Sequence, residues 1–276
     1  MAFENEIKKY EELRQRYQSL IINKMDREEY IMYNEVLFST HSCAIEGNSF
    51  SVDDTRELKE KGLGMIPAGK TLFEAFEMLD HFEAYEYMIQ HLQHPLDENL
   101  LKEINKRVTL HTLRSPDAIP GEYTTTDMAA GDTVFGDHEE LIARVPQLLE
   151  STEKAIQAVI QAKNADRKQK EATNALHPMV LAARFHGFYD YLHPFRDGNG
   201  RTGRLVSNYI LLRLGHPLLV IPSDCRNEYI SALRMIRTEA TDEHLIHFFF
   251  KMATDRMEQE IKQKEANTKR FTTFLF

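Results

Sequence analysis

Residues 193–204 read HPFRDGNGRTGR and bring the side chains of an anion-handling site into twelve positions. Three glycines let the backbone approach a ligand closely and adopt positive φ. A turn of this kind that leads into a helix directs backbone N–H groups at one point, which suits a phosphate. Arg201 and Arg204 are three residues apart, so they share a face of that helix, and guanidinium groups match phosphate oxygens. The stretch therefore predicts a site for a phosphate-bearing ligand.

Two further side chains in this stretch could act on such a ligand. His193 carries the one group there that exchanges a proton near neutral pH, so it can serve as a general base. Asp197 offers hard carboxylate oxygens of the kind that Mg²⁺ takes when it also binds phosphates. Together with the arginines, they predict a site that transfers part of a nucleotide.

Two helices are expected to position these groups. Apolar residues recur with helical spacing before the stretch, from Leu181 to Leu192, and again after it, from Leu205 to Leu212. Gly215 followed by Pro217 is a typical helix stop. The glycines at 198, 200 and 203 also match the GxGxxG pattern of dinucleotide sites. That pattern needs a preceding strand, and the expected helix before His193 argues against it.

The twelve residues match the signature HxFx(D/E)GNGRxxR, and the chain thereby resembles Fic (Fido) domain proteins. The similarity extends to three other segments. Residues 177–191 resemble the helix before the signature, and residues 121–135 resemble the family's β-hairpin flap. Residues 229–233 resemble the helix that closes the adenine pocket. The resemblance implies an all-α, Fic-type helical bundle with one short β-hairpin flap.

The resemblance also implies an activity, the transfer of AMP from ATP to a Ser, Thr or Tyr hydroxyl of a target protein. In this scheme His193 accepts the proton of the attacking hydroxyl, and Asp197 ligates an Mg²⁺ ion that bridges the α- and β-phosphates. Arg201 and Arg204 hold the phosphates that leave, where charge develops in the transition state. The other nucleotide-binding positions implied are Gly198, Asn199, Gly200, Thr202, Gly203, Tyr229, Met128, Ala129, Ala130 and Gly131.

The flap at 121–135 is expected to dock the target protein. In relatives this hairpin pairs its main chain with the target segment, a mode of β-augmentation. Thr124 stands where an arginine is frequent in the family.

Residues 42–47, SCAIEG, fit the family's inhibitory pattern (S/T)xxxE(G/N). If Glu46 reaches Arg204, it takes the guanidinium that should hold the γ-phosphate, and transfer becomes slow. Ser42 and Gly47 are the other two positions of this inhibitory motif, and Gly47 is a plausible residue just beyond a helix end. The alternative is that the motif is an ordinary capped helix end.

Composition limits the class of protein. The chain has 276 residues, 42% hydrophobic and 28% charged, which is typical of a globular protein with a substantial core. A net charge of −9 disfavours broad affinity for nucleic acid. Two cysteines make no disulfide framework, and neither a signal peptide nor a membrane span is seen. We therefore expect a cytoplasmic protein with no nucleic-acid or membrane partner, and a homodimer remains open.

Most of the chain has helical periodicity, and we expect three regions. These are an N-terminal helical extension at 1–95 with the inhibitory motif, a Fic core at 96–260 and a C-terminal tail at 261–276. Six residues look like helix N-caps: Asp26, Ser51, Thr71, Asp97, Asp224 and Asp242. Residues 139–163 should form one helix, and residues 123–126 and 128–134 a hairpin turning at Gly131 and Asp132.

Two alternatives to AMP transfer from ATP remain. A Fic-type transferase could use another phosphate-linked donor or remove AMP from a modified protein. A nucleotide-binding module without turnover is the second alternative, against which an intact His193 argues.

Overall fold

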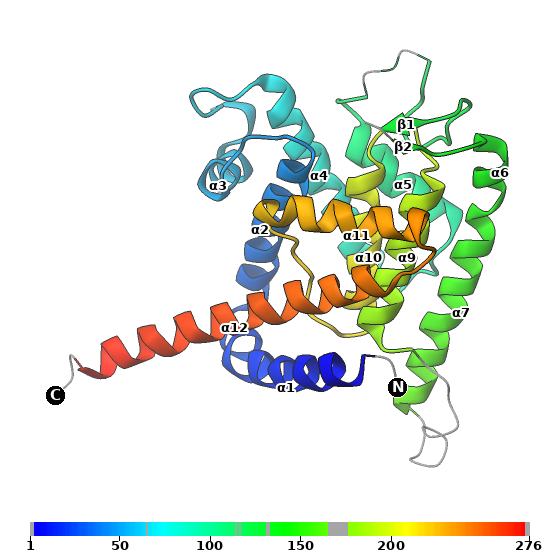
Figure 1. Ribbon diagram of the computed structural model, residues 1–276. Helices are drawn as coiled ribbons and strands as arrows, with labels where there is room; N and C mark the ends of the chain where they lie inside the picture. Colours follow the sequence, from blue (N-terminus) through cyan, green and yellow to red (C-terminus); the bar gives the residue numbers. More distant parts are fainter. Residues whose placement is uncertain are drawn as a thin grey trace.

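The computed structural model describes residues 3–64, 66–113, 115, 117–130, 133–164 and 176–273. It is almost entirely helical (Figure 1), which confirms the predicted all-α class with one hairpin. The helices are α1 (Glu4–Leu20), α2 (Arg27–Ile45), α3 (Val52–Lys61), α4 (Leu72–Gln90), α5 (Glu98–Thr109), α6 (His138–Ala143), α7 (Val145–Asn164), α9 (Pro178–Leu192), α10 (Asn199–Arg213), α11 (Arg226–Thr238) and α12 (Glu243–Thr273). Short 3₁₀ turns lie at Ile22–Lys24, Gly62–Gly64 and Ser223–Cys225.

The core is built around α9 and α10, which pack against each other at the centre of the molecule. Helix α10 is buried along most of its length, because α2, α4 and α5 also pack on it. One hydrophobic cluster extends from Tyr10 to Ile261. The expected extension at 1–95 therefore shares the core with the rest of the chain, and α12 continues unbroken into the expected tail at 261–276. Among the described residues, no helix is long and apolar enough to cross a membrane.

Four of the predicted helix caps are confirmed. The carboxylates of Asp26 and Asp97 accept hydrogen bonds from the first-turn amides of α2 and α5. Ser51 and Thr71 each form a capping box with the acidic residue three positions later. These caps are predictable because each depends only on residues within one helical turn.

One of the predicted caps is wrong, and Asp242 has the cap position of α12 without a side-chain bond to its amides. Asp224 lies in the 3₁₀ turn that precedes α11, and the N-cap of α11 is Cys225, without a side-chain bond. The carboxylate of Asp242 pairs with Arg184 of α9 at 2.7 Å, and Thr241 Oγ1 accepts from the Glu243 amide instead. The expected helix at 139–163 is also divided at Arg144, since α6 ends and α7 begins there beside Pro146, which has no amide hydrogen to donate.

The hairpin is shorter than expected. Strand β1 (Ala129–Ala130) pairs antiparallel with β2 (Thr133–Val134), so the strands lie within 128–134. The predicted first strand at 123–126 is not part of this sheet. Tyr123 instead forms an isolated bridge with Phe195, and the Thr124 amide donates to the Pro194 carbonyl at 2.9 Å. The predicted turn at Gly131 and Asp132 lies outside the described residues.

Candidate active site

The loop between α9 and α10 is held by close packing and by its own side chains. Helix α9 ends at Leu192, and His193 follows in the left-handed region with φ 46°. The side-chain amide of Asn199 closes the loop. Its Oδ1 accepts from Phe195 N at 3.0 Å, and its Nδ2 donates to Phe195 O at 2.6 Å. Gly198 has φ 75°, and a Cβ there would lie 2.7 Å from Thr109 Cγ2. The loop therefore places the residues on either side of it with little freedom.

A cavity of about 310 Å³ lies at the N-terminus of α10. His193, Gly200, Arg204 and Tyr229 line it, and so does Glu46 from α2. A larger hollow of about 570 Å³ lies between α1, α11 and α12, but no residue of the 193–204 stretch lines it. The smaller cavity is the candidate site because the predicted base and a predicted phosphate ligand meet there.

His193 is presented as a neutral base. Its ring stacks on Phe135, with centroids 3.8 Å apart. Its Nδ1 is buried and has no hydrogen-bond partner among the described residues. Burial, helped by the nearby positive charge of Arg237, lowers the pKa of His193 to about 4. At neutral pH the imidazole is therefore in the form that can accept a proton.

Glu46 occupies the position expected for an anion. Its Oε1 lies 2.7 Å from Arg204 Nη2, and a Cβ on Gly200 would be 2.3 Å from that same oxygen. The carboxylate thus lies over the first turn of α10, where free N–H groups favour negative charge. Burial acts to raise the pKa of Glu46, but Arg204, aided by Arg201 and Arg226, outweighs it and lowers that pKa.

Ser42 and Gly47 frame this contact. The Ser42 hydroxyl accepts from Arg204 Nε at 3.0 Å, and the Ser42 carbonyl accepts from Nη2 at 2.8 Å. Gly47 has φ 107° and follows the last residues of α2. Its amide donates to the Ala44 carbonyl at 3.1 Å, which terminates the helix. Ser42 and Glu46 therefore occupy Nε and Nη2 of Arg204, and Gly47 ends α2 just after them.

Arg201 lies away from the cavity, although it shares a helix with Arg204. It is 4% exposed, with Nη1 2.7 Å from Glu77 Oε1 of α4 and Nη2 3.4 Å from Asp197 Oδ1. It is not among the residues that line the cavity. Thr202 is fully buried and accepts from the Asn105 amide at 3.1 Å. These two residues fix α10 to its neighbours.

Gly203 has a packing role. A Cβ there would lie 2.9 Å from ring atoms of His186 and of Tyr189. The glycine thus allows α10 to approach α9 closely.

Asp197 has one oxygen engaged and one available. Oδ1 accepts from the Gly198 amide at 2.6 Å and pairs with Arg201. No described residue bonds to Oδ2, and 39% of the side chain is exposed. This arrangement fits an Mg²⁺ ion that takes one carboxylate from the protein and its other ligands from phosphates and water.

Tyr229 lies beneath the cavity and is only 1% exposed. Its hydroxyl accepts from Arg204 Nη1 at 3.4 Å and lies 2.5 Å from His186 Nε2. Burial lowers the pKa of His186 to about 3, so this imidazole is neutral and its Nε2 shares one hydrogen bond with the Tyr229 hydroxyl. Tyr229 therefore holds Arg204 through its hydroxyl group.

The flap lies beside the base. The Met128 carbonyl accepts from the Phe135 amide at 3.0 Å, and Thr133 of β2 lines the cavity. Ala129 is exposed, and β1 continues through Ala130. Gly131 lies outside the described residues. Arg196 is exposed, and its Nη1 donates to Thr126 Oγ1 at 3.3 Å.

Five charged residues at or near the site escaped the sequence reasoning: Glu77, Asp190, Arg226, Arg234 and Arg237. Asp190 and Arg237 line the cavity, and burial raises the pKa of Asp190 to about 6. One sequence signal was present for Glu77, since it lies on the apolar face of α4, where a carboxylate needs a partner.

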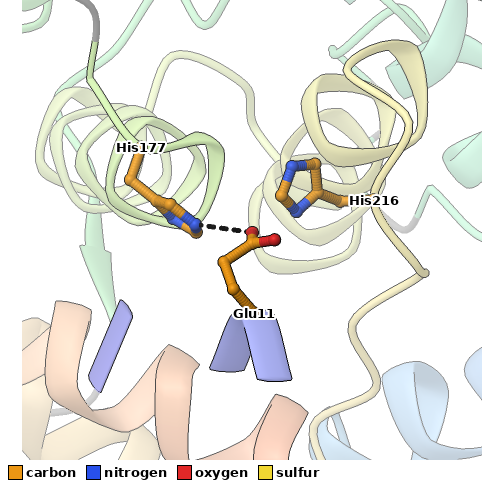
Figure 2. A group of neighbouring side chains, drawn as sticks. All are labelled: Glu11, His177 and His216. Carbon is orange, nitrogen blue, oxygen red and sulfur yellow. Dashed lines mark hydrogen bonds and ion pairs between the residues drawn. The ribbon is translucent and has the colours of Figure 1, made fainter. Parts of the chain in front are cut away.

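One group of metal-type donors lies elsewhere in the described part of the chain. Figure 2 shows the side chains of Glu11, His177 and His216 close together, and their donor atoms lie within 4.8 Å of one another. Glu11 already pairs with His177 at 3.1 Å and with Arg14 at 2.6 Å. His216 Nδ1 bonds to the Tyr10 hydroxyl at 2.9 Å. The cluster thus ties α1 to the start of α9 and to the loop after α10.

Comparisons with known proteins agree with this geometry. The model of the Fic/DOC family matches residues 95–211. "Protein adenylyltransferase Fic" of Drosophila grimshawi is 32% identical over 71% of this chain and 36% of its own length. The chain thus spans little more than a third of that relative.

Solved structures share the fold. A Fic-domain signaling protein from Bacteroides thetaiotaomicron has a TM-score of 0.73 and 23% identity, covering 94% of this chain and 97% of its own. Fic-1 of C. elegans has a TM-score of 0.71 and 22% identity, covering 94% of this chain and 71% of its own.

Proposed function

Because the chain belongs to the Fic/DOC family, we propose that its cavity transfers AMP from ATP to a hydroxyl side chain of a target protein. One observation carries the proposal: a neutral, unpaired imidazole and a buried guanidinium line the same cavity at a helix N-terminus. A base and an anion site in the same cavity are what nucleotidyl transfer needs.

In the proposed reaction, His193 accepts the proton of the target hydroxyl as the oxygen attacks the α-phosphate. The bond from the α-phosphorus to the bridging oxygen breaks, and pyrophosphate leaves. The N-terminus of α10 and Arg204 stabilise the charge that develops on the phosphates. Asp197 Oδ2 would hold Mg²⁺, which supplies further charge neutralisation when bound.

The target segment is proposed to lie along the flap at 121–135. Strand β1 has one edge paired with β2, and a short extended segment can add to the other edge. Thr133 and Phe135 then lie between the target and the base.

The protein is proposed to be autoinhibited by Glu46. Its carboxylate and a γ-phosphate would compete for Arg204 and for the first turn of α10. With Glu46 in place, ATP would bind with its α-phosphate out of line with the attacking hydroxyl. Glu46 and Arg204 belong to one chain, and their contact supports inhibition in cis.

The direct test is to incubate the protein with α-labelled ATP, Mg²⁺ and a cell lysate. We expect label on protein and a mass gain of one AMP on modified peptides. His193→Ala should still bind ATP and transfer nothing. Label lost only from a pre-modified protein would indicate AMP removal. ATP binding without any transfer, also after Glu46→Ala, would contradict the proposal and favour a binding module.

A further inference from the structure

Arg237 of α11 caps the helix that carries the base. Its Nη2 donates to the carbonyl oxygens of Asp190 at 2.8 Å and of Tyr191 at 2.5 Å. These carbonyls lie in the last turn of α9, where helical partners are lacking. Arg237 thus holds the end of α9 immediately before His193.

The same guanidinium also holds the flap. It lies over the ring of Phe135, 4.4 Å from the centroid, and over the ring of Tyr191, at 4.5 Å. Phe135 in turn stacks on His193. Arg237, Phe135 and His193 therefore form a continuous stack that joins α11, the flap and the end of α9.

We propose that Arg237 is a positioning residue, which clamps Phe135 against His193 and so fixes the imidazole for proton transfer. The inference rests on the proposed function, because positioning matters only if His193 acts as a base. The imidazole of His193 has few orientations available, because Phe135 covers one face of the ring and the capped end of α9 holds the backbone of His193. A fixed orientation shortens the search for the reactive geometry.

Arg237 is not the only charge near His193. The other charged or titratable groups of the surrounding elements are Glu46, Asp190, Arg204, Arg226 and Arg234 in the cavity, and His138, paired with Asp127, behind the flap. Arg237 differs from them because it contacts both structures that hold the imidazole. The competing role is that Arg237 binds the nucleotide, since it also lines the cavity.

The test compares Arg237→Met, which removes the charge and both carbonyl bonds, with Arg237→Lys, which keeps the charge. Arg184→Met is the matched control, because it removes an arginine of α9 that pairs with Asp242 outside the cavity. Each change is made in the wild type and in a Glu46→Ala background. The readouts are kcat and KM for ATP, and the NMR titration of the His193 imidazole without nucleotide.

For Arg237→Met we expect kcat to fall about tenfold or more, KM for ATP to stay within about threefold, and the pKa of His193 to rise. Arg237→Lys should restore the pKa of His193 more fully than it restores kcat. Arg184→Met should change neither the pKa nor kcat. An unchanged kcat, or a raised KM with kcat intact, would overturn the clamp.

Three further outcomes bear on the clamp and on the proposed function. If Arg237→Met does not fold, Phe135→Leu removes the stacked ring and leaves the helix cap, and it should lower kcat in the same way; an unchanged kcat would again overturn the clamp. Absence of transfer in every variant, wild type included, would contradict the proposed function. An unmoved His193 titration in Arg237→Met would contradict the clamp itself.

Discussion

His193 owes its chemistry to what surrounds it rather than to its type alone. An exposed histidine is about one-third protonated near pH 6.8 when its pKa is about 6.5. Here burial and the charge of Arg237 lower the pKa to about 4, so almost all of the imidazole is neutral at pH 7. The lowered pKa also makes the His193 imidazole a weaker base than an exposed histidine.

The pH dependence follows from this shift. Because the pKa of His193 is lowered, the base form is present above that pKa and is lost as the pH falls through it. We expect kcat/KM for AMP transfer to be level from about pH 5.5 to pH 8 and to fall below about pH 5. An acid limb centred near pH 6.5 would show instead that the imidazole is solvated and unperturbed.

Tyr229 offers a second test at this scale. Tyr229→Phe removes the hydroxyl that His186 Nε2 and Arg204 Nη1 contact, and leaves the buried Nε2 of His186 without its hydrogen-bond partner. We expect the free energy of unfolding to fall by about 1–3 kcal/mol in urea titrations. Phe248→Leu, a conservative change in a ring that packs on Tyr229, is the control for packing alone. No loss of stability in Tyr229→Phe would show that the hydroxyl is not a structural partner.

Helices α4 and α10 are joined by a buried ion pair. Arg201 and Glu77 have side chains only 5% and 10% exposed, and Glu77 Oε2 also accepts from Asn48 at 2.9 Å. Removing the carboxylate leaves the buried guanidinium with only its longer contact to Asp197, at 3.4 Å, which is costly.

We therefore expect Glu77→Ala to lower the free energy of unfolding by about 3–5 kcal/mol. Glu86→Ala is the matched control, since Glu86 is on the same helix, is 48% exposed and pairs with Lys59; it should cost about 1 kcal/mol or less. Equal losses for the two variants, measured by chemical denaturation, would mean that the Arg201–Glu77 pair does not hold α4 to α10.

Predictability at the scale of elements depends on the range of the interaction. The caps at Asp26, Ser51, Thr71 and Asp97 were foreseen because each bonds within its own first turn. The first strand of the hairpin was misplaced because residues 123–124 pair with 194–195, far along the chain.

The site itself divides in the same way. The residues of the 193–204 stretch can be predicted from their spacing in the sequence. Glu77 and Arg237 do not, because their roles arise only when α4 and α11 pack against α10 and α9. The direction in which Arg201 points is likewise set by α4 and not by its spacing from Arg204.

At the scale of the whole molecule, the N-terminal helices and the signature form one body. Helix α2 packs on α10 and delivers Glu46 to a residue 158 positions later. The lowered pKa of Glu46 keeps the pair with Arg204 ionised at neutral pH. Because that folded-state pKa is lowered, the stabilisation is present above the usual carboxylate range and is lost only as the pH falls through the lowered value. Mild acidification should therefore leave the contact intact.

The central claim is that this contact restrains a competent transferase, and the rate of AMP transfer measures it most directly. Initial rates should be compared for wild type, Glu46→Ala, Glu46→Gly and Glu46→Ala combined with Arg204→Ala, at matched ATP and Mg²⁺, with His193→Ala as the blank. We predict a gain of about tenfold or more for both single variants, equivalent to about 1.4 kcal/mol, and loss of that gain in the double variant. Equal rates for wild type and both Glu46 variants, all above the blank, would contradict the account.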